Sequence, residues 1–358
     1  MLNVLYDINI FKDICLLKLK GDIMTRGKLS ILACESGGPF AKKILDEIIK
    51  KKGEVKFISS SEVKFANLER KTVIKESIRG ADVYIIQDVE NSANGFSVDE
   101  NLRALKTAID AAWRSDANYI TTVIPVFPYA RQDKQEGREG ITAAAVAREI
   151  EDAHANHVIT LDVHNTSIAG FFREAKFEDL HASKNIINYV IKNKEIFDLE
   201  NLVVMPPDVG GAPRAKHYAK QLRTRLVFAY KDRNYDIPNS LESIQIVGEV
   251  KGKDVLIVDD MIDTAETLIE VIKAAKEKSA KRIYAACSLA LFNRDALERI
   301  TKAYEKKYLT AVIGTDAVYH GDDFQENNPW YKEVSVAGYF AKVISKLNQG
   351  KSISKLLE

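Results

Sequence analysis

The sequence predicts an α/β fold of two tandem domains, each a mainly parallel sheet flanked by helices. Short apolar runs alternate with longer amphipathic segments nearly throughout the 358 residues, and this alternation is typical of parallel sheets that helices cover on both faces. The run GADVYIIQD at 80–88 returns as GKDVLIVDD at 252–260. In both places a polar loop, a helical pattern and another strand pattern follow in the same order, so we expect two copies of one fold.

The individual elements follow from the spacing of apolar residues. Seven apolar runs predict strands, at 82–87, 119–127, 157–163, 201–207, 226–230, 254–260 and 282–292. Helical spacing between several of these runs predicts helices at 99–114, 142–153 and 265–278. A last helical pattern at 336–349 predicts a closing helix that could pack on either half.

The repeated pattern places the join between the domains near residues 173–178. We expect three segments, which are an N-terminal extension at 1–28, a first domain at 29–174 on which the C-terminal helix 335–358 could pack, and a second domain at 175–334.

Composition excludes several classes of protein. Hydrophobic residues make up 46% and charged residues 29%, which fits a folded globular chain rather than a disordered one. The formal net charge is +1, so we expect no nucleic-acid or membrane partner, and phosphate binding has to come from local clusters. No apolar run approaches the ~18 residues of a membrane span. The three cysteines are widely spaced without a C-x-x-C pair, which favours a reduced, cytoplasmic compartment.

The strongest candidate site is the stretch VDDMIDTAET at 258–267, which ends an apolar strand and opens a helix. Ligands of open parallel sheets collect at the carboxyl ends of strands, where a helix start offers free N–H groups to an anion. Asp259 and Asp260 can bond the vicinal hydroxyls of a furanose, directly or through Mg²⁺. Asp263, Thr264 and Thr267 add further polar groups to the loop, and the two hydroxyls suit phosphate oxygens. A solvated acidic turn with a Thr cap is the simpler alternative.

Three other strand ends carry side chains suited to catalysis or binding. Arg131 and Gln132 follow the broken strand PVFPYA and can hold phosphate oxygens and a nucleoside edge, although a solvated turn is the commoner use. Asp162 and His164 alternate at a strand end, so they share one side and suit a metal or a phosphate. Asp208 precedes two glycines and a helix, where it could hold magnesium or simply cap the helix.

Two segments are ambiguous on their own. In FANLERK, Phe65 and Glu69 suggest adenine recognition through a stacking face and an acceptor, although Phe65 alone would be interpreted as core. Lys231 and Arg233 follow the apolar run LVFAY, where two cations are most often a solvated strand end. They also suit phosphoryl-type transfer, which needs charge stabilisation more than covalent catalysis.

Together these stretches resemble the ribose-phosphate pyrophosphokinase (phosphoribosyl-pyrophosphate synthetase) family. VDDMIDTAET is similar to the phosphoribosyl-pyrophosphate binding loop. Further stretches agree in the family's order: FANLE (65–69), IRGADVYIIQ (78–87), VIPVFPYARQDK (123–134), VITLDVHNTSIAGFF (158–172), PPDVGGAPRAK (206–216), KDR (231–233), IQIVGEV (244–250) and GKSISKLL (350–357). The resemblance leaves only the N-terminal extension outside, and it implies two phosphoribosyltransferase-like domains.

The resemblance also implies substrates, a cofactor and residue roles. It implies ATP and ribose 5-phosphate as substrates, Mg²⁺ as cofactor, and a homo-oligomer built on dimers, commonly a hexamer. The implied ATP-binding residues are Phe65, Asn67, Glu69, Arg131, Gln132 and His164, and the implied metal ligands are His164 and Asp208. The implied catalytic residues are Lys231 and Arg233. The implied ribose-5-phosphate loop consists of Asp259, Asp260, Asp263, Thr264, Ala265, Glu266 and Thr267.

The sequence departs from the family pattern at four places. Asn67 stands where the family has Asp, the flap at 134–140 is short with few basic residues, and Asp232 interrupts a commonly basic run. Ala265 and Glu266 stand where the family usually has a small residue followed by Gly, which lets the backbone approach a phosphate closely. Glu266 would be tolerated if its side chain turned to solvent or to a nearby Lys, whereas an inward carboxylate would oppose the phosphate. We expect a working but weakened site.

Two alternatives to an active synthetase stay open from the sequence. A catalytically weak or inactive synthetase-like subunit that regulates active ones would explain Glu266, Asn67 and the short flap. A phosphoribosyltransferase would share the VDDMIDTAET pattern, but it would not explain the tandem repeat or the FANLE, ARQD and DVH stretches.

Overall fold

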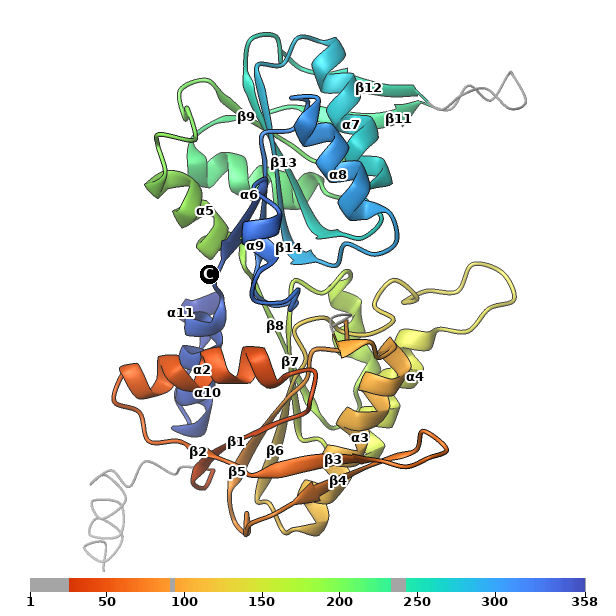
Figure 1. Cartoon of the computed structure of the whole chain (residues 1–358), viewed down its shortest axis with the longest axis vertical. Helices are drawn as coiled ribbons and strands as arrows, with labels where there is room; N and C mark the ends of the chain where they lie inside the picture. Colours follow the sequence, from red (N-terminus) through yellow and green to blue (C-terminus); the bar gives the residue numbers. More distant parts are fainter. Residues whose placement is uncertain (1–25, 91–93, 233–242, 358) are drawn as a thin grey trace, which may run out of the picture.

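The chain forms two six-stranded parallel sheets, one in each half. The structure is a computed structural model that describes residues 26–90, 94–232 and 243–357 (Figure 1). The first sheet has the strand order β2-β1-β5-β6-β7-β8 and the second has β10-β9-β13-β14-β15-β16. Renumbered within its own half, each sheet has the order 2-1-3-4-5-6. The prediction of two tandem α/β domains of one fold is therefore confirmed.

In the first half, helices and a hairpin surround the sheet. The strands are β1 (Leu29–Ala33), β2 (Lys56–Phe57), β5 (Asp82–Ile86), β6 (Tyr119–Val123), β7 (His157–Leu161) and β8 (Lys176–Leu180). The helices are α2 (Gly38–Lys50), α3 (Val98–Arg114), α4 (Thr142–Asp152) and the short 3-10 helix η2 (Thr166–Phe171). Ser97 and Glu100 form a capping box that starts α3. The antiparallel hairpin of β3 (Ser60–Lys64) and β4 (Arg70–Ile74) packs on α3.

The second half repeats this plan, including a hairpin before its third strand. The sheet strands are β9 (Leu202–Met205), β10 (Arg225–Leu226), β13 (Asp254–Ile262), β14 (Arg282–Ala290), β15 (Ala311–Thr315) and β16 (Tyr331–Val334). The hairpin strands are β11 (Phe228–Asp232) and β12 (Ser243–Val247). The helices are α5 (Ser183–Lys192), α6 (Ala212–Leu222), α7 (Glu266–Glu277), α8 (Ala296–Glu305) and α9 (Phe324–Asn327).

Strand β8 belongs to the first sheet, although it follows the expected domain boundary between residues 174 and 175. It pairs in parallel with β7 from Lys176 to Leu180. By sheet membership the first half therefore extends to Leu180. The sequence hides this strand because β8 is an edge strand that buries only Leu180 fully, so its segment KFEDL lacks a continuous apolar run.

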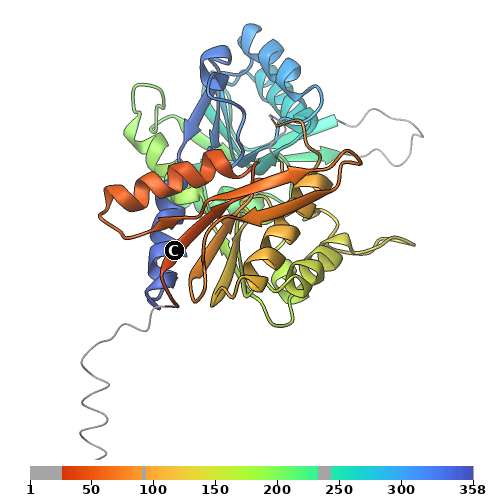
Figure 2. The same cartoon turned by 60° about the horizontal axis from the view of Figure 1, so that its bottom comes forward.

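The chain returns to the first sheet at its end. Helix α10 (Ala337–Asn348) lies against α2 (Figures 1 and 2), where Phe340 meets Phe40 edge to face at 5.2 Å between ring centroids. The amide of Asn348 donates to Asp82 Oδ2 at 2.9 Å. The short helix α11 (Ser354–Leu357) follows. Among the described residues, no helix is long and apolar enough to cross a membrane.

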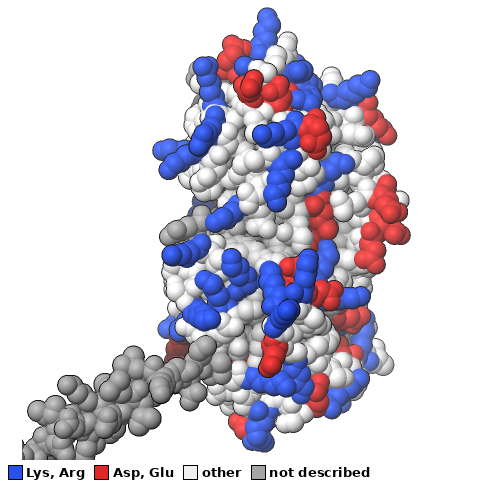
Figure 3. Space-filling model, turned by 90° about the vertical axis from the view of Figure 1, so that its left-hand side faces the viewer, with Lys and Arg blue, Asp and Glu red and all other residues white. Residues whose placement is uncertain are grey.

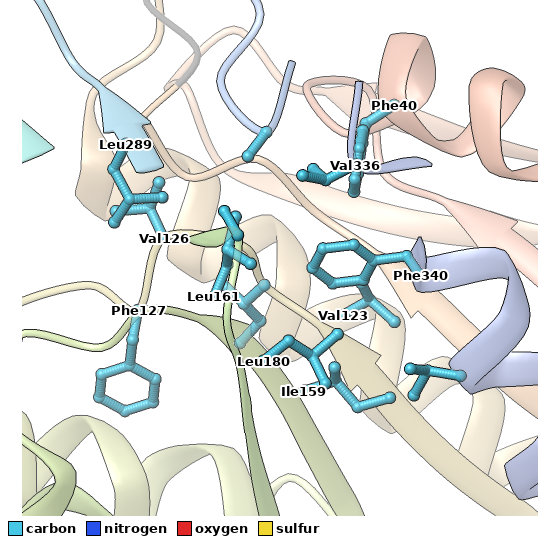
Figure 4. Close-up of a cluster of buried hydrophobic side chains, with 14 of the residues drawn as sticks. Phe40, Val123, Val126, Phe127, Ile159, Leu161, Leu180, Leu289, Val336 and Phe340 are labelled. Carbon is cyan, nitrogen blue, oxygen red and sulfur yellow. The ribbon is translucent and has the colours of Figure 1, made fainter. Parts of the chain in front are cut away.

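A shared apolar core joins the two halves. Figure 4 shows Leu289, from β14 of the second half, beside Val126 of the first half. Leu161 and Leu180 from the first sheet and Val336 before α10 belong to the same buried cluster (Figure 4). Because close-packed interiors resist sliding, this core holds the carboxyl ends of the two sheets in a defined relation.

Charged side chains join the halves at the surface as well. Lys43 of α2 lies 3.2 Å from Asp316 and 3.1 Å from Glu333, both in the second half. On the face shown in Figure 3, Lys and Arg side chains are more widespread than acidic ones. The net charge of +1 means that this local excess is nearly balanced over the whole chain.

Candidate active site

The candidate site is a cavity of about 460 Å³ at the carboxyl ends of the strands of the second sheet. Ile257 and residues 259–268, from β13, the following turn and the start of α7, form one side. Asp208 of the turn after β9 and Arg214 in the first turn of α6 form another part of the wall. The first half adds Arg131 and His164. The cavity therefore lies between the two halves, at the edge where parallel sheets bind ligands.

The two aspartates of VDDMIDTAET lie on the extended end of β13. This strand continues to Ile262 and pairs with β14 beyond both aspartates, and the two carboxylates lie close enough for their charges to interact. Asp260 is almost fully buried, whereas the Asp259 side chain is 33% exposed. Arg214 lies 3.5 Å from Asp259 and 3.7 Å from Asp260. The guanidinium thus offsets the charge of a carboxylate pair in a confined space.

His164 connects the first half to this pair. Its Nδ1 lies 2.8 Å from Asp260 Oδ2, and this hydrogen bond raises the pKa of His164 despite partial burial. Burial alone would raise the pKa of Asp260, but the hydrogen bond to His164 and the charge of Arg214 outweigh it and hold that pKa below the usual range. Burial and the charge of Asp260 raise the pKa of Asp259. Because Nδ1 faces Asp260, the Nε2 atom is the one left for a ligand.

Asp263 is held from two sides. Arg131 of the first half forms an ion pair with Asp263 Oδ2, and the Asn293 side-chain amide donates to Asp263 Oδ1 at 2.9 Å. Both oxygens of Asp263 therefore have partners that draw the carboxylate toward the walls of the cavity.

The turn into α7 has an unusual backbone. Ala265 adopts a left-handed conformation with φ of +60° and precedes Glu266, the first residue of the helix. Thr264, Ala265, Glu266 and Thr267 all line the cavity. The first N–H groups of any helix have no partner within it, so this turn can bind an anion. The Glu266 side chain is 64% exposed, so it turns to solvent, which is one of the two tolerated alternatives, and its cationic partner is Arg299 of α8 at 3.0 Å rather than a Lys.

Asp208 lies on an exposed turn after β9, where its Oδ1 accepts a hydrogen bond from the Gly211 N–H at 3.0 Å. It therefore braces the start of α6 while it lines the cavity. Among the described residues, no three His, Cys, Asp or Glu side chains form a preformed metal cage.

Arg131 and Gln132 also border a second, smaller cavity of about 320 Å³ that adjoins the first. Its walls include Phe127, Tyr129 and Met261, which offer an apolar and aromatic surface. Gln132 Oε1 accepts a hydrogen bond from the Thr142 hydroxyl at 2.5 Å.

Other predicted site residues lie elsewhere or outside the described part of the chain. Phe65, Asn67 and Glu69 lie at the tip of the β3–β4 hairpin and line neither of these two cavities. The Phe65 side chain is exposed, with Lys71 Nζ 5.6 Å from its ring centroid. Lys231 lies in β11, but its side chain, like all of Arg233, is outside the described residues.

The sequence interpretation missed two arginines at this site. Arg214 lies within the quoted stretch PPDVGGAPRAK, and a cation in the first turn of a helix that follows a strand end could have suggested a site residue. Arg299 lies more than thirty residues beyond the loop that it contacts, and its local sequence carries no signal of that contact.

Comparisons with known proteins point to one family. A family model described as the N-terminal domain of ribose phosphate pyrophosphokinase matches residues 29–153, and a phosphoribosyl transferase domain model matches residues 176–324. A ribose-phosphate pyrophosphokinase of Chlorobaculum tepidum is 41% identical over 79% of this chain and 82% of its own. One from Staphylococcus haemolyticus is 37% identical over 92% and 97%.

The fold agrees as well. The crystal structure of phosphoribosylpyrophosphate synthetase from Mycobacterium smegmatis matches with a TM-score of 0.79 at 28% identity, over 90% of this chain and 99% of that one. Sequence identity, domain order and fold lead to one conclusion: the chain belongs to the ribose-phosphate pyrophosphokinase family.

Proposed function

We propose that this protein transfers the diphosphoryl group of ATP to the C1 hydroxyl of ribose 5-phosphate, giving phosphoribosyl pyrophosphate and AMP. The observation that carries the proposal is the single cavity in which the carboxylates of Asp259 and Asp260, an anion-binding helix start and cations from both halves meet. Each of these features suits one part of a sugar phosphate that reacts with a nucleoside triphosphate.

Ribose 5-phosphate occupies the β13 side of the cavity in this proposal. Asp259 and Asp260 accept hydrogen bonds from the ribose hydroxyls, and the turn of residues 263–267 binds the 5-phosphate through N–H groups and Thr hydroxyls. The contacts of Asp260 to His164 and Arg214 keep it ionised and fix its direction. The sugar is then held so that its C1 oxygen can align with the phosphate that it attacks.

The chemical step is a displacement at the β-phosphorus of ATP. The C1 oxygen forms a bond to that phosphorus, the bond to the oxygen bridging the α-phosphorus breaks, and AMP leaves with the bonding pair. The hydroxyl proton passes to water. A loose transition state needs little help from a base, and cations that neutralise the phosphate oxygens contribute most. Arg131 and Arg214 line the cavity, and we assign the same task to Lys231 and Arg233.

Mg²⁺ fits the donor groups of this cavity. Magnesium is usually bound by one or two carboxylates together with substrate phosphates rather than by a complete protein cage, which agrees with the lack of a three-residue cluster among the described residues. Asp208 and the free Nε2 of His164 are the groups that would hold it. When bound, the metal supplies charge neutralisation to the triphosphate.

ATP binding by Phe65, Asn67 and Glu69 requires a second copy of the chain in this proposal. These residues lie on a hairpin apart from both cavities of their own chain. Arg131 and Gln132, by contrast, line the smaller of the two cavities. A homo-oligomer in which the hairpin of one copy reaches the cavity of another would unite the two sets.

An assay with purified protein tests the activity directly. Incubation with Mg-ATP and ribose 5-phosphate should yield AMP and phosphoribosyl pyrophosphate in equal amounts, and EDTA should abolish both products. Absence of turnover across pH and phosphate concentration, with ATP binding retained, would contradict the proposal and favour a regulatory subunit. In the same assay, Lys231→Ala should lower kcat far more than it weakens ATP binding.

Mixing two inactive variants tests the shared site. Phe65→Ala and Asp260→Asn each remove one half of the site, so each homo-oligomer should have little activity. Mixed oligomers would regain activity, because some sites combine an intact hairpin with an intact cavity. No recovery after dissociation and reassembly of the mixture, confirmed by size-exclusion chromatography, would count against the shared site.

A further inference from the structure

Glu266 poses a physical problem at the phosphate-binding turn. It is the first residue of α7 and lines the cavity, so its carboxylate could meet the 5-phosphate of the sugar. Two negative groups at one helix start compete for the same N–H groups and the same dipole. The inference below rests on the proposed function, because it concerns the ribose-5-phosphate loop of that site.

Arg299 of α8 contacts this turn at two points. Its NH1 donates to the Thr264 carbonyl oxygen at 2.8 Å, and its NH2 lies 3.0 Å from Glu266 Oε1. The same NH2 lies 3.3 Å from Asp295, four residues earlier on the chain. The two contacts with the turn fall on either side of Ala265, the residue with the left-handed backbone. One guanidinium therefore fixes the carbonyl before this residue and the side chain after it.

The guanidinium lies outside the cavity. Among the described residues, Glu266 belongs to the cavity lining whereas Arg299 does not. The Glu266 side chain is 64% exposed, and that of Arg299 is 30% exposed. The ion pair therefore draws the carboxylate toward α8 and solvent. Arg299 binds three acceptors of the chain and does not line the cavity, so a phosphate there has to be bound by other groups.

The other carboxylate of the turn is held in a similar way. Asp263 has Arg131 on one oxygen and Asn293 on the other. With both carboxylates occupied by partners, the groups that remain for a phosphate are the N–H groups of the helix start and the hydroxyls of Thr264 and Thr267. A glycine at position 266 would leave the helix start free of negative charge because it has no side chain. Here the pairing of the Glu266 side chain has the same result.

We propose that Arg299 is a positioning residue of the ribose-5-phosphate site: it holds the Glu266 carboxylate away from the sugar phosphate and fixes the carbonyl of the turn. The Glu266–Arg299 pair thus leaves the helix start open to an anion although its first residue carries a carboxylate. With the carboxylate held away, the site should bind ribose 5-phosphate with full affinity, and not with the weakened affinity that we expected from the sequence.

A double-mutant cycle tests this coupling. Arg299→Met frees the Glu266 carboxylate, so it should raise both the KM and the Kd for ribose 5-phosphate about fivefold, with kcat changed less than about twofold. Glu266→Gln alone should change the KM little, because the charge that it removes is already held away. In the Glu266→Gln background, Arg299→Met should raise the KM less than about twofold. Arg299→Lys should restore part of the affinity.

Lys302→Met is the matched control. Lys302 lies on the same helix and pairs with Glu298 at the surface, so its loss removes an equal charge without touching the turn. We expect an unchanged KM for this variant. Thermal unfolding of every variant identifies any general loss of folding.

Equal effects of Arg299→Met in the wild-type and Glu266→Gln backgrounds would overturn the proposal, as would an unchanged KM in the wild-type background. The Kd, measured by isothermal titration calorimetry without ATP, separates this test from that of the activity. A protein that binds ribose 5-phosphate but forms no product refutes the proposed function while the cycle can still be measured. A wild-type protein that does not bind ribose 5-phosphate refutes the inference too.

Discussion

Strands β5 and β13 begin alike and end differently. Each is the third strand of its own half and follows a glycine, Gly80 or Gly252, with φ of +70°. Each opens on a fully buried aspartate, Asp82 or Asp254. These shared features explain why the two stretches of sequence resemble each other. In each half, the glycine and the aspartate turn the chain into the centre of a parallel sheet.

The carboxyl ends of the two strands have different partners. After β5, the Asp88 carboxylate accepts the N–H of Tyr319 at 2.9 Å and that of Glu90 at 3.2 Å. Backbone donors thus occupy it, and one of them comes from the other half of the chain. The equivalent Asp260 of β13 instead contacts His164 and Arg214 inside the cavity.

The comparison teaches that position at a strand end does not by itself make a carboxylate functional. An aspartate whose oxygens are bound by backbone N–H groups stabilises the fold, because removing it leaves those donors buried and unsatisfied. An aspartate that faces ionisable side chains in a cavity has its charge directed at a ligand. The first copy of the pattern contributes a contact between the halves, and the second lines the candidate cavity.

The largest expected effect distinguishes these two aspartates. Asp260→Asn should lower kcat/KM by roughly 10²–10³-fold, because His164 and Arg214 lose their charged partner. Asp88→Asn should leave kcat/KM within about threefold and lower the stability by about 1 kcal/mol. Steady-state kinetics and thermal unfolding of both variants give the answer, and similar losses of activity would show that both ends serve catalysis.

The next effect concerns Asp82 and Asp254, the buried aspartates at the beginning of β5 and β13. Asp254 accepts two hydrogen bonds at 3.1 Å from Arg282 Nε, whereas Asp82 has the neutral amide of Asn348. Arg282→Met leaves the buried Asp254 carboxylate without its charged partner. We expect the free energy of unfolding to fall by about 2 kcal/mol, which is below the range for fully buried pairs because Arg282 is partly exposed. Urea unfolding measures it. The exposed neighbour Lys281→Met is the control, and an equal loss there would refute the explanation.

A smaller and equal effect is expected at the two glycines. No atom lies within 4 Å of an added Cβ at Gly80 or Gly252, so an alanine would meet only backbone strain. Each substitution to Ala should lower the stability by about 1 kcal/mol. Urea unfolding measures the loss of stability in each variant. Unequal losses would mean that the turns before β5 and β13 are less alike than their torsion angles indicate.

The smallest effect is a pH dependence of the stability that originates at Asp82. Burial raises the pKa of Asp82, although Asn348 and Arg26 partly offset this. The native state therefore binds more protons than the unfolded state, and the free energy of unfolding falls as pH rises from the ordinary carboxyl value, about 4, through the raised native value. The Asp82→Asn variant has no carboxyl group at this position, so its free energy of unfolding should not show this fall with pH.

Thermal unfolding between about pH 4 and pH 7 would show it. The Tm of Asp82→Asn should approach that of the wild type at the acidic end and rise relative to it toward neutral pH. A difference in Tm that stays constant with pH would contradict a raised pKa.

Local patterns in the sequence were sufficient for the fold and for much of the site. The alternation of apolar strands with amphipathic helices predicted two parallel sheets, because burial on both faces requires continuous apolar runs. The order of strand, carboxylates and helix start predicted a ligand-binding loop at the carboxyl end of a strand. The structure places residues 259–267 along a cavity, and their individual roles stay predictions. The edge strand β8 was missed, since a half-exposed strand carries little of that signal.

Only the tertiary structure decided which side chains meet. His164 and Asp260 are 96 residues apart, and Arg131 and Asp263 are 132 apart. Arg299 reaches Glu266 from a different helix, and the hairpin with Phe65 lies apart from both cavities. Apolar periodicity records which face of an element is buried, but it holds no information on the register and packing that bring distant strand ends together. The sequence by itself therefore determined the type of site, and the packing of the two halves determined the partners that direct its charges.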